Sequence, residues 1–151
     1  MKKIKKETII EFLIVVIVIS ILGFITYKQF SLAEAKSRDV QRKNDLQEVS
    51  KAIRLYFADY GHLPAKDLDI NKLWGKNFTD DKGYEYMKNM PKENSLSDKP
   101  YCYMEDKTNG SFTLFAQLED SSDVDCKKDG SLCGGVKYCY TNNINVNDST
   151  K

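Results

Sequence analysis

The sequence has few of the residues from which catalytic sites are built. Its single histidine is His62, and it has neither a glycine-rich phosphate loop nor a cluster with the spacing of metal ligands. Covalent catalysis needs a nucleophile with a base beside it, and no motif of that kind is present. His62 lies between Gly61 and Pro64, where a turn that ends a helix explains it. We therefore expect no enzymatic activity.

Helix-breaking residues are rare in the first part of the chain. No proline occurs before Pro64, and Gly23 is the only glycine before Gly61. Since proline and glycine interrupt helices, one helix could run from about residue 8 to about residue 60, a length of about 80 Å at roughly 1.5 Å per residue. Gly61 and Pro64 form its predicted stop signal.

The second half of this helix is amphipathic. Apolar residues recur at steps of three and four, the period of one helix face: Val40, Leu46, Val49, Ile53, Tyr56, Phe57 and Tyr60. We expect the rest of the chain to cover this face. The basic residues between them are expected to form a solvated face: Arg38, Arg42, Lys43 and Arg54.

Neither sign of charge dominates, because the formal net charge is only +1. Bulk charge therefore indicates no nucleic-acid partner. The charges are nevertheless uneven along the chain. Lys2, Lys3, Lys5 and Lys6 lie at the start without an acid among them, whereas acidic residues outnumber lysines after Pro100.

Cysteine is absent from the first two thirds of the chain. The four cysteines lie in the last third: Cys102, Cys126, Cys133 and Cys139. An even number of cysteines in an exported region predicts two disulfides, with three possible pairings. A zinc site is the competing interpretation, but the closely paired ligands of zinc sites are missing.

One long hydrophobic run is present near the start of the chain. It extends over Phe12–Tyr27 and is interrupted only by Ser20, Gly23 and Thr26. With the isoleucines just before it, the run approaches the roughly 20 residues that cross a bilayer, so residues 7–28 are predicted to form a transmembrane helix. The lysines before the run predict a cytoplasmic N-terminus and an exported remainder.

Glu11 lies at the edge of this run, where residues that face hydrocarbon are expected. One explanation is local. Thr8 and Glu11 have the spacing of a capping box, and a carboxylate in the first turn suits the helix dipole. A plain membrane anchor could therefore carry Glu11.

Strand signals are concentrated in the last third of the chain. The segments "YCYME" (Tyr101–Glu105) and "SFTLFAQLE" (Ser111–Glu119) flank Asn109-Gly110, a dipeptide typical of hairpins. The segment "VKYCYTN" is expected to form a third strand.

Several segments together resemble the type IV pilin and pseudopilin superfamily, including the major pseudopilins of type II secretion. In that family a short basic leader precedes an apolar stretch whose glutamate is fifth in the mature protein. The stretch "ETIIEFLIVVIVISILGF" is similar, with Glu7 first and Glu11 fifth. The segment "YFADYGHLP" (56–64) is similar to the turn after the family's helix, and "YCYMEDKTNGSFTLFAQLE" resembles its first hairpin. The resemblance covers roughly residues 4–119.

The resemblance implies an α+β fold, with one long helix packed on a small antiparallel sheet, and a structural function. The chain would be a membrane-inserted subunit that polymerises into a type IV pilus or a secretion pseudopilus. Glu11 would set the register by meeting the N-terminal amine of a neighbouring subunit, which offsets the cost of a carboxylate in lipid. The implied partners are copies of the chain, a prepilin peptidase, and the assembly platform with its motor. The implied location is the cytoplasmic membrane and then an extracellular filament.

On this interpretation the chain has five parts: a basic leader (1–6), a transmembrane and filament-core helix (7–28), its amphipathic continuation (29–61), an exported globular region stapled by cysteines (62–141) and a polar tail (142–151). The first part of the globular region, residues 62–100, is expected to have little regular structure beyond one short helix that ends before Pro91.

Two positions depart from the family's leader motif. Lys6 stands where the family has the glycine that prepilin peptidase needs, and Glu7 stands where the first mature residue is usually an N-methylated phenylalanine. Three alternatives stay open. A divergent peptidase removes the leader, the subunit stays anchored in the membrane without polymerising, or Lys6 itself supplies the positive partner of Glu11.

The major pseudopilins also carry a calcium site in their final loops. Here Asp120, Asp123 and Asp125 could offer hard oxygen ligands. The glycine-containing segment of the family's calcium site is missing, and a solvated acidic loop beside Cys126 is the favoured interpretation. No cofactor is expected.

An ordinary secretory signal peptide is the main rival interpretation. The lysines, the apolar core and the small-residue site Ala33-Glu34-Ala35 match its outline, and the product would be a soluble exported protein that begins near Lys36. The core is long for a signal peptide, and the helical pattern continues through the site. The pilin-like interpretation is therefore preferred.

Overall fold

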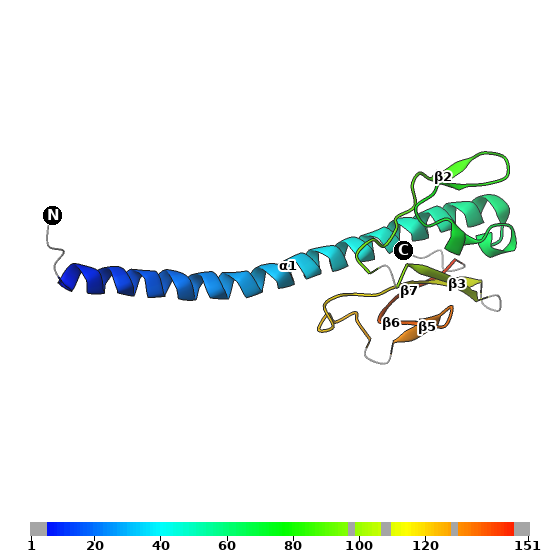
Figure 1. The fold of residues 1–151 in the computed structure, drawn as a ribbon. Helices are drawn as coiled ribbons and strands as arrows, with labels where there is room; N and C mark the ends of the chain where they lie inside the picture. Colours follow the sequence, from blue (N-terminus) through cyan, green and yellow to red (C-terminus); the bar gives the residue numbers. More distant parts are fainter. Residues whose placement is uncertain (1–5, 97–98, 107–109, 128–129, 147–151) are drawn as a thin grey trace. The chain divides into compact units, whose positions relative to one another are not determined.

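The computed structural model describes residues 6–96, 99–106, 110–127 and 130–146, without the side chains of residues 6–8, 25–29 and 65. The chain contains two compact units, Met1–Ser37 and Arg38–Lys151. The elements in chain order (Figure 1) are helix α1 (Lys6–Tyr60), the short 3₁₀ helices η1 (Pro64–Lys66) and η2 (Ile70–Lys72), and the strands β1 (Phe78–Thr79), β2 (Glu85–Met87), β3 (Cys102–Asp106), β4 (Ser111–Ala116), β5 (Ser131–Cys133), β6 (Val136–Tyr138) and β7 (Tyr140–Asn145).

Helix α1 has the extent that the scarcity of helix breakers predicts. It ends at Tyr60, where Gly61 takes a φ of 72°, in the left-handed region that glycine reaches without steric cost. The Gly61 N–H donates to the Phe57 carbonyl at 2.8 Å, and Pro64 then opens η1. The predicted stop signal is confirmed.

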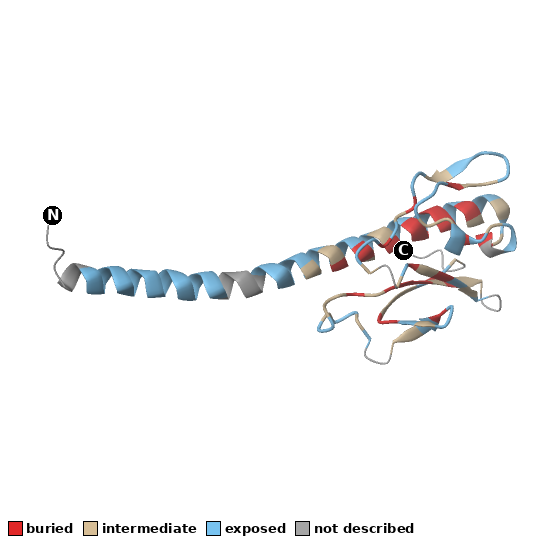
Figure 2. Ribbon diagram, viewed as in Figure 1, coloured by how far each residue is buried: buried red, intermediate tan, exposed pale blue. Residues whose placement is uncertain are grey.

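The first unit is helical throughout its described part, residues 6–37. Its described large apolar side chains are all exposed (Figure 2), from 42% at Val16 to 68% at Phe12. No helix among the described residues is long and apolar enough to cross a membrane. The predicted transmembrane helix over residues 7–28 is therefore not supported.

In the second unit the amphipathic face of α1 is covered, as the spacing predicts. Its side chains Leu46, Val49, Ile53 and Tyr56 are buried. They share one core with residues of the sheets and the connector: Leu63, Ile70, Phe78, Met90, Tyr101, Tyr103, Phe112, Leu114, Ala116 and Ile144. Burial of this apolar surface, at roughly 25 cal/mol per Å², is the main force that holds the unit together.

Within the described residues, the strands form three small antiparallel sheets. The largest has the order β3-β4-β7, with Tyr103 opposite Leu114 and Leu114 opposite Asn142. Strand β1 pairs with β2, and β5 pairs with β6. Between β3 and β4, Gly110 has a φ of 59° in the predicted hairpin, and Asn109 of the same turn lies outside the described residues. The predicted α+β fold, a long helix packed on small antiparallel sheets, is confirmed.

The connector contains a strand where the sequence pattern predicts a short helix. Residues Glu85–Met87 form β2, and the Tyr86 ring packs on Tyr56 of α1 with 5.3 Å between the ring centroids. Aromatic side chains favour the pleated surface of a sheet. This contact with α1 outweighs the local helical pattern, and the predicted helix is wrong.

The last strand extends further along the chain than the sequence predicts. The predicted third strand is interrupted at Cys139, so that it becomes β6 and β7, and β7 pairs with β4 as far as Asn145. The first residues of the predicted polar tail therefore belong to the main sheet. Residues 147–151 of that tail lie outside the described residues.

Candidate functional site

The predicted assembly residue, Glu11, lies on α1 in the first unit. Its side chain is exposed, and the side chains that follow it, Phe12–Ile19, are apolar and exposed. No charged residue follows until after Phe24. Contiguous apolar surface is rare on monomeric proteins and marks an interaction site. The helix therefore presents one carboxylate at the edge of an otherwise uncharged surface.

The residues predicted to flank the cleavage point, Lys6 and Glu7, form the start of α1. Their side chains are outside the described residues, as are residues 1–5 of the predicted leader. Because Lys6 and Glu7 are already helical, Thr8 does not stand at the start of the helix. The capping-box explanation of Glu11 is therefore wrong.

A buried ionic cluster joins α1 to the loops of the second unit. Arg42, with 3% of its side chain exposed, donates from Nε and Nη2 to the Glu93 carboxylate at 2.5 and 3.2 Å. It also donates to Asp39 at 2.6 Å and to Glu119 at 2.7 Å. Arg38 adds two hydrogen bonds to Glu119, at 2.8 and 2.6 Å. The planar guanidinium matches the two oxygens of a carboxylate, so these contacts fix geometry as well as charge.

Backbone groups complete the cluster. Asp39 is 1% exposed, and its carboxylate accepts the N–H of Glu119 at 2.9 and 3.1 Å and that of Asp120 at 2.8 Å. Glu93 accepts the N–H groups of residues 95–96 at 2.7 and 3.1 Å. Buried charges are tolerated only when they are paired and hydrogen-bonded. Both carboxylates meet that condition.

The cluster shifts the protonation equilibria of its members. Hydrogen bonds from Arg38 and then Arg42 outweigh the effect of burial and lower the pKa of the Glu119 carboxyl to about 2. Burial raises the pKa of Glu93, but hydrogen bonds from Arg42 and from backbone amides lower it more, so it lies below its usual value. Burial lowers the pKa of Arg42, and its three carboxylate partners more than reverse that effect. Arg42, Glu93 and Glu119 are therefore charged at neutral pH.

The predicted solvated face is wrong for Arg42, and the predicted buried stripe is wrong for Val40. In the structure Arg42 is buried and Val40 is 57% exposed, whereas Arg54 is exposed as predicted. Asp39, at the i,i+3 position from Arg42, is the local signal that could have indicated an inward ion pair. Glu93 lies 51 residues from Arg42, and no local signal connects them.

The aspartates predicted as weak calcium candidates lie in the loop between β4 and β5. Asp120 accepts hydrogen bonds from the Ser122 N–H at 2.9 Å and from its hydroxyl at 2.5 Å. Asp123 and Asp125 both accept from the Lys43 ammonium, at 2.7 and 2.6 Å. The loop is thus bound to α1 by a lysine that the sequence pattern places on the solvated face.

All four cysteines form disulfides, as the sequence predicts. Cys102 on β3 pairs with Cys133 on β5, and Cys126 pairs with Cys139. Such cross-links stabilise a fold mainly by restricting the unfolded chain. The first disulfide links the main sheet to the β5-β6 hairpin. The second joins Cys126, at the end of the acidic loop (residues 119–125), to Cys139, which directly precedes β7.

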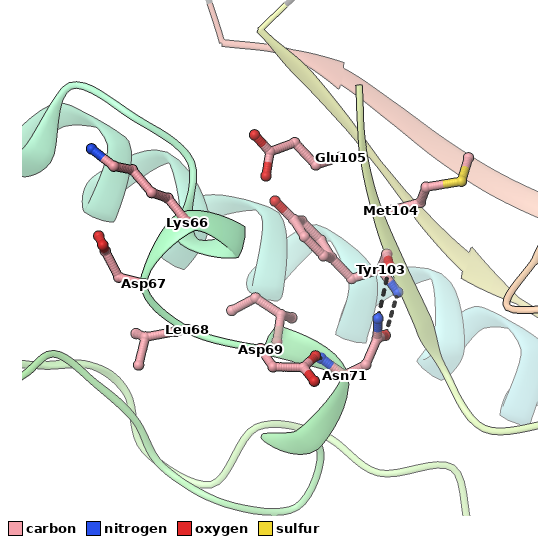
Figure 3. A pocket seen from close by; sticks show the side chains of 9 residues that line it. Lys66, Asp67, Leu68, Asp69, Asn71, Tyr103, Met104 and Glu105 are labelled. Atoms are coloured by element: carbon pink, nitrogen blue, oxygen red, sulfur yellow. Dashed lines mark hydrogen bonds between the residues drawn. The ribbon is translucent and has the colours of Figure 1, made fainter. Parts of the chain in front are cut away.

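A hollow of about 520 Å³ lies between the η1–η2 segment and β3 (Figure 3). Asn71 ties the two sides together, because its side-chain amide donates to the Tyr103 carbonyl at 2.9 Å and its oxygen accepts the Tyr103 N–H at 2.7 Å. The Tyr103 hydroxyl and Oε2 of Glu105 are buried without a hydrogen-bond partner among the described residues. The residues that line the hollow include the charged side chains of Lys66, Asp67 and Glu105.

His62 lies in the turn that follows α1. Its Nε2 is 3.4 Å from Oδ2 of Asp67, and its ring meets the Tyr56 ring edge-on with 6.1 Å between the centroids. These contacts tie the turn to the helix end. They support the structural role that the sequence predicts for His62.

The comparison with known families agrees with this arrangement. The family model described as "Type II secretion system (T2SS), protein G" matches residues 30–133. The match includes the second half of α1, the β3-β4 hairpin, the ionic cluster and the acidic loop. Searches of curated proteins and of solved structures found no match. Since the family model covers more than half of the chain, the chain belongs to the type II secretion system protein G family, a family of major pseudopilins.

Proposed function

We propose that the chain is a structural subunit of a type II secretion pseudopilus and that it polymerises through the first stretch of α1. The observation that carries this proposal is the surface of residues 9–24, where each described large apolar side chain is at least 42% exposed. Apolar surface of this extent is stable in water only when another molecule covers it. Copies of the same helix offer a surface of the same chemistry. Membership of a structural, non-enzymatic family supports the same function.

In a bundle of such helices Glu11 sets the register. A carboxylate surrounded by apolar side chains carries a large desolvation cost unless a cation lies beside it. The attraction between two unit charges about 4 Å apart grows from roughly 1 kcal/mol in water to roughly 4 kcal/mol at an effective dielectric constant of 20. Two copies therefore associate most strongly in the one stagger that brings a cation of the neighbour to Glu11.

The start of the chain determines which cation is available. Cleavage between Lys6 and Glu7 by a prepilin peptidase would create a new N-terminal amine on the same helix as Glu11. Without cleavage, the Lys6 ammonium would be the cation. The remaining partners in this proposal are other copies of the chain and the assembly platform with its motor. Family membership supports a membrane-associated or extracellular place of assembly.

Glu11→Gln tests the register role, because it keeps the size of the side chain and removes its charge. We expect the yield of filaments to fall at least about tenfold, which corresponds to a loss of roughly 1.4 kcal/mol per contact. Circular dichroism and thermal unfolding should stay unchanged. Glu48→Gln, at an exposed position of α1 in the second unit, is the matched control and should leave filaments intact. A normal filament yield from Glu11→Gln contradicts the register role.

The N-terminal sequence and intact mass of the chain recovered from filaments identify the cation. A chain that begins at Glu7 supports cleavage and the new amine, whereas an uncut chain supports Lys6. A soluble chain that begins near Lys36, with no filaments, contradicts the proposal and supports a secretory signal peptide instead.

A further inference from the structure

The acidic loop, residues 119–125, is where the resemblance to major pseudopilins implies a calcium ion, and its residues do not fit one. Calcium takes about six to eight oxygen ligands in proteins. Asp120 is engaged by Ser122, and the carboxylates of Asp123 and Asp125 are engaged by Lys43. A calcium ion at these oxygens would lie beside a positive charge. In the part of the chain that the structure describes, no group of three or more His, Cys, Asp or Glu side chains is arranged to hold a metal ion.

We propose that the Lys43 ammonium is itself the cation of this loop, so that the loop folds onto α1 without calcium. The Nζ atom lies 2.7 Å from Oδ1 of Asp123 and 2.6 Å from Oδ2 of Asp125, so one ammonium bridges two carboxylates. The Lys43 side chain is only 19% exposed, and partial exclusion of water strengthens both contacts. The Tyr140 ring, with its centroid 5.6 Å from Nζ, adds a cation–π contact.

Lys43 acts on a loop whose two ends are already fixed. Asp39, one helical turn before Lys43, accepts the backbone N–H groups at the start of the loop. The disulfide between Cys126 and Cys139 holds its end. Residues 121–125 lie between these anchors, and Lys43 contacts two of them. One turn of α1 therefore fixes both the start and the middle of the loop.

The two carboxylates also keep the Lys43 amine protonated. Partial burial lowers the pKa of Lys43, but the hydrogen bonds and charges of Asp123 and Asp125 outweigh it and raise the pKa above its ordinary value. The Lys43 side chain therefore carries its positive charge at neutral pH. Asp125 is 53% exposed, so water solvates the negative charge that a single ammonium leaves unbalanced.

The first test is thermal unfolding of the full-length chain in detergent solution, measured in EDTA, in millimolar calcium and in millimolar magnesium. A ligand that binds only the folded state raises Tm. We expect the same Tm in all three solutions. Magnesium controls for effects that any divalent ion would have. A rise of Tm in calcium but not in magnesium overturns the proposal, as does a fall in EDTA that calcium alone reverses.

The second test is Lys43→Met, which removes the charge and keeps most of the side-chain length. We expect Tm to fall by several degrees, on the order of 2–8 °C, because two carboxylates are left facing one another. Lys51→Met, at an exposed position of α1, is the matched control and should change Tm by no more than about 1 °C. A Tm for Lys43→Met equal to that of the control overturns the proposal. If Lys43→Met fails to fold, the Tm values of the unaltered chain in EDTA, calcium and magnesium still test the proposal. Neither readout depends on polymerisation, so failure here leaves the proposed function untouched.

Discussion

Two stretches of helix α1 differ in where their side chains find contacts. Between Ile9 and Phe24 the described large apolar side chains are all exposed, whereas Leu46, Val49 and Ile53 are completely buried (Figure 2). The backbone hydrogen bonds are of the same kind in both stretches, so helix formation does not decide burial. The difference is that the second unit supplies a sheet and a connector that cover one face of its own helical stretch.

The charged groups of the two stretches differ in the same way. Glu11 is exposed, and no hydrogen bond or ion pair joins it to a described side chain, whereas buried Arg42 binds three carboxylates. A helical stretch whose charged and apolar side chains contact other parts of the same chain contributes to the folding of that chain. A stretch whose charged and apolar side chains are exposed depends on other molecules to cover them. Substitutions in the second stretch should therefore alter folding, and those in the first should alter assembly.

The largest effect on folding is expected from Arg42→Met. This change removes the charge at the centre of the cluster and leaves Asp39 and Glu93 as buried carboxylates without their main partner. Breaking a buried pair in this way costs about 3–5 kcal/mol. Urea denaturation of the full-length chain measures the loss, with Arg54→Met at an exposed position as the control. A loss below about 1 kcal/mol, the value typical of surface pairs, would mean that the second stretch does not depend on its buried charges.

A matched pair of leucines tests the comparison directly. Leu46 is completely buried, whereas Leu13 is 54% exposed. Leu46→Ala should lower the free energy of unfolding by about 2–5 kcal/mol, because it removes buried methyl groups and leaves a cavity. Leu13→Ala should change it by no more than about 0.5 kcal/mol and should instead reduce filament yield. Equal losses from the two variants in urea denaturation would show that both stretches belong to one folding unit, and the comparison would fail.

Most of the fold could be predicted from local signals. The scarcity of proline and glycine predicts α1, and its end at Gly61 follows from the backbone freedom of glycine alone. The spacing of three and four predicts which leucines and isoleucines are buried. Strand β2 could not be predicted in this way. Its residue Tyr86 packs on Tyr56 of α1, and a contact between residues so far apart in the sequence leaves no local pattern.

The ionic cluster and the acidic loop could be predicted only in part. A basic helix and an acidic loop are visible in the sequence. Their opposite charges alone do not determine whether the ion pairs form within one chain or between subunits. Glu93 lies 51 residues from Arg42, and Asp123 lies 80 residues from Lys43. Only the fold brings them together. A hydrophobic pattern also treats every arginine as solvent-facing, so it misplaces the one arginine whose charge is fully paired inside.

The smallest effect is a dependence of stability on pH that belongs to Glu119. Its carboxyl has an ordinary pKa of 4.5, which the hydrogen bonds of Arg38 and then Arg42 lower to about 2 in the folded chain. The folded state therefore binds the proton less readily than the unfolded state. The stability that results is fully present above pH 4.5 and is lost as the pH falls towards 2. The shift corresponds to at most about 3 kcal/mol, and solvent screening at half-exposed Arg38 reduces the expected contribution to about 1–2 kcal/mol.

Glu119→Gln isolates this contribution from those of other groups. Burial raises the pKa of Asp45, which makes its contribution grow as the pH falls, so the total stability of the chain does not report Glu119 alone. The difference between the unaltered chain and Glu119→Gln in urea denaturation should be about 1–2 kcal/mol at pH 7 and should shrink steadily below pH 4.5. A difference that stays constant with pH would mean that Glu119 acts through packing and not through charge. The contrast between the two stretches of α1 would then be one of burial alone.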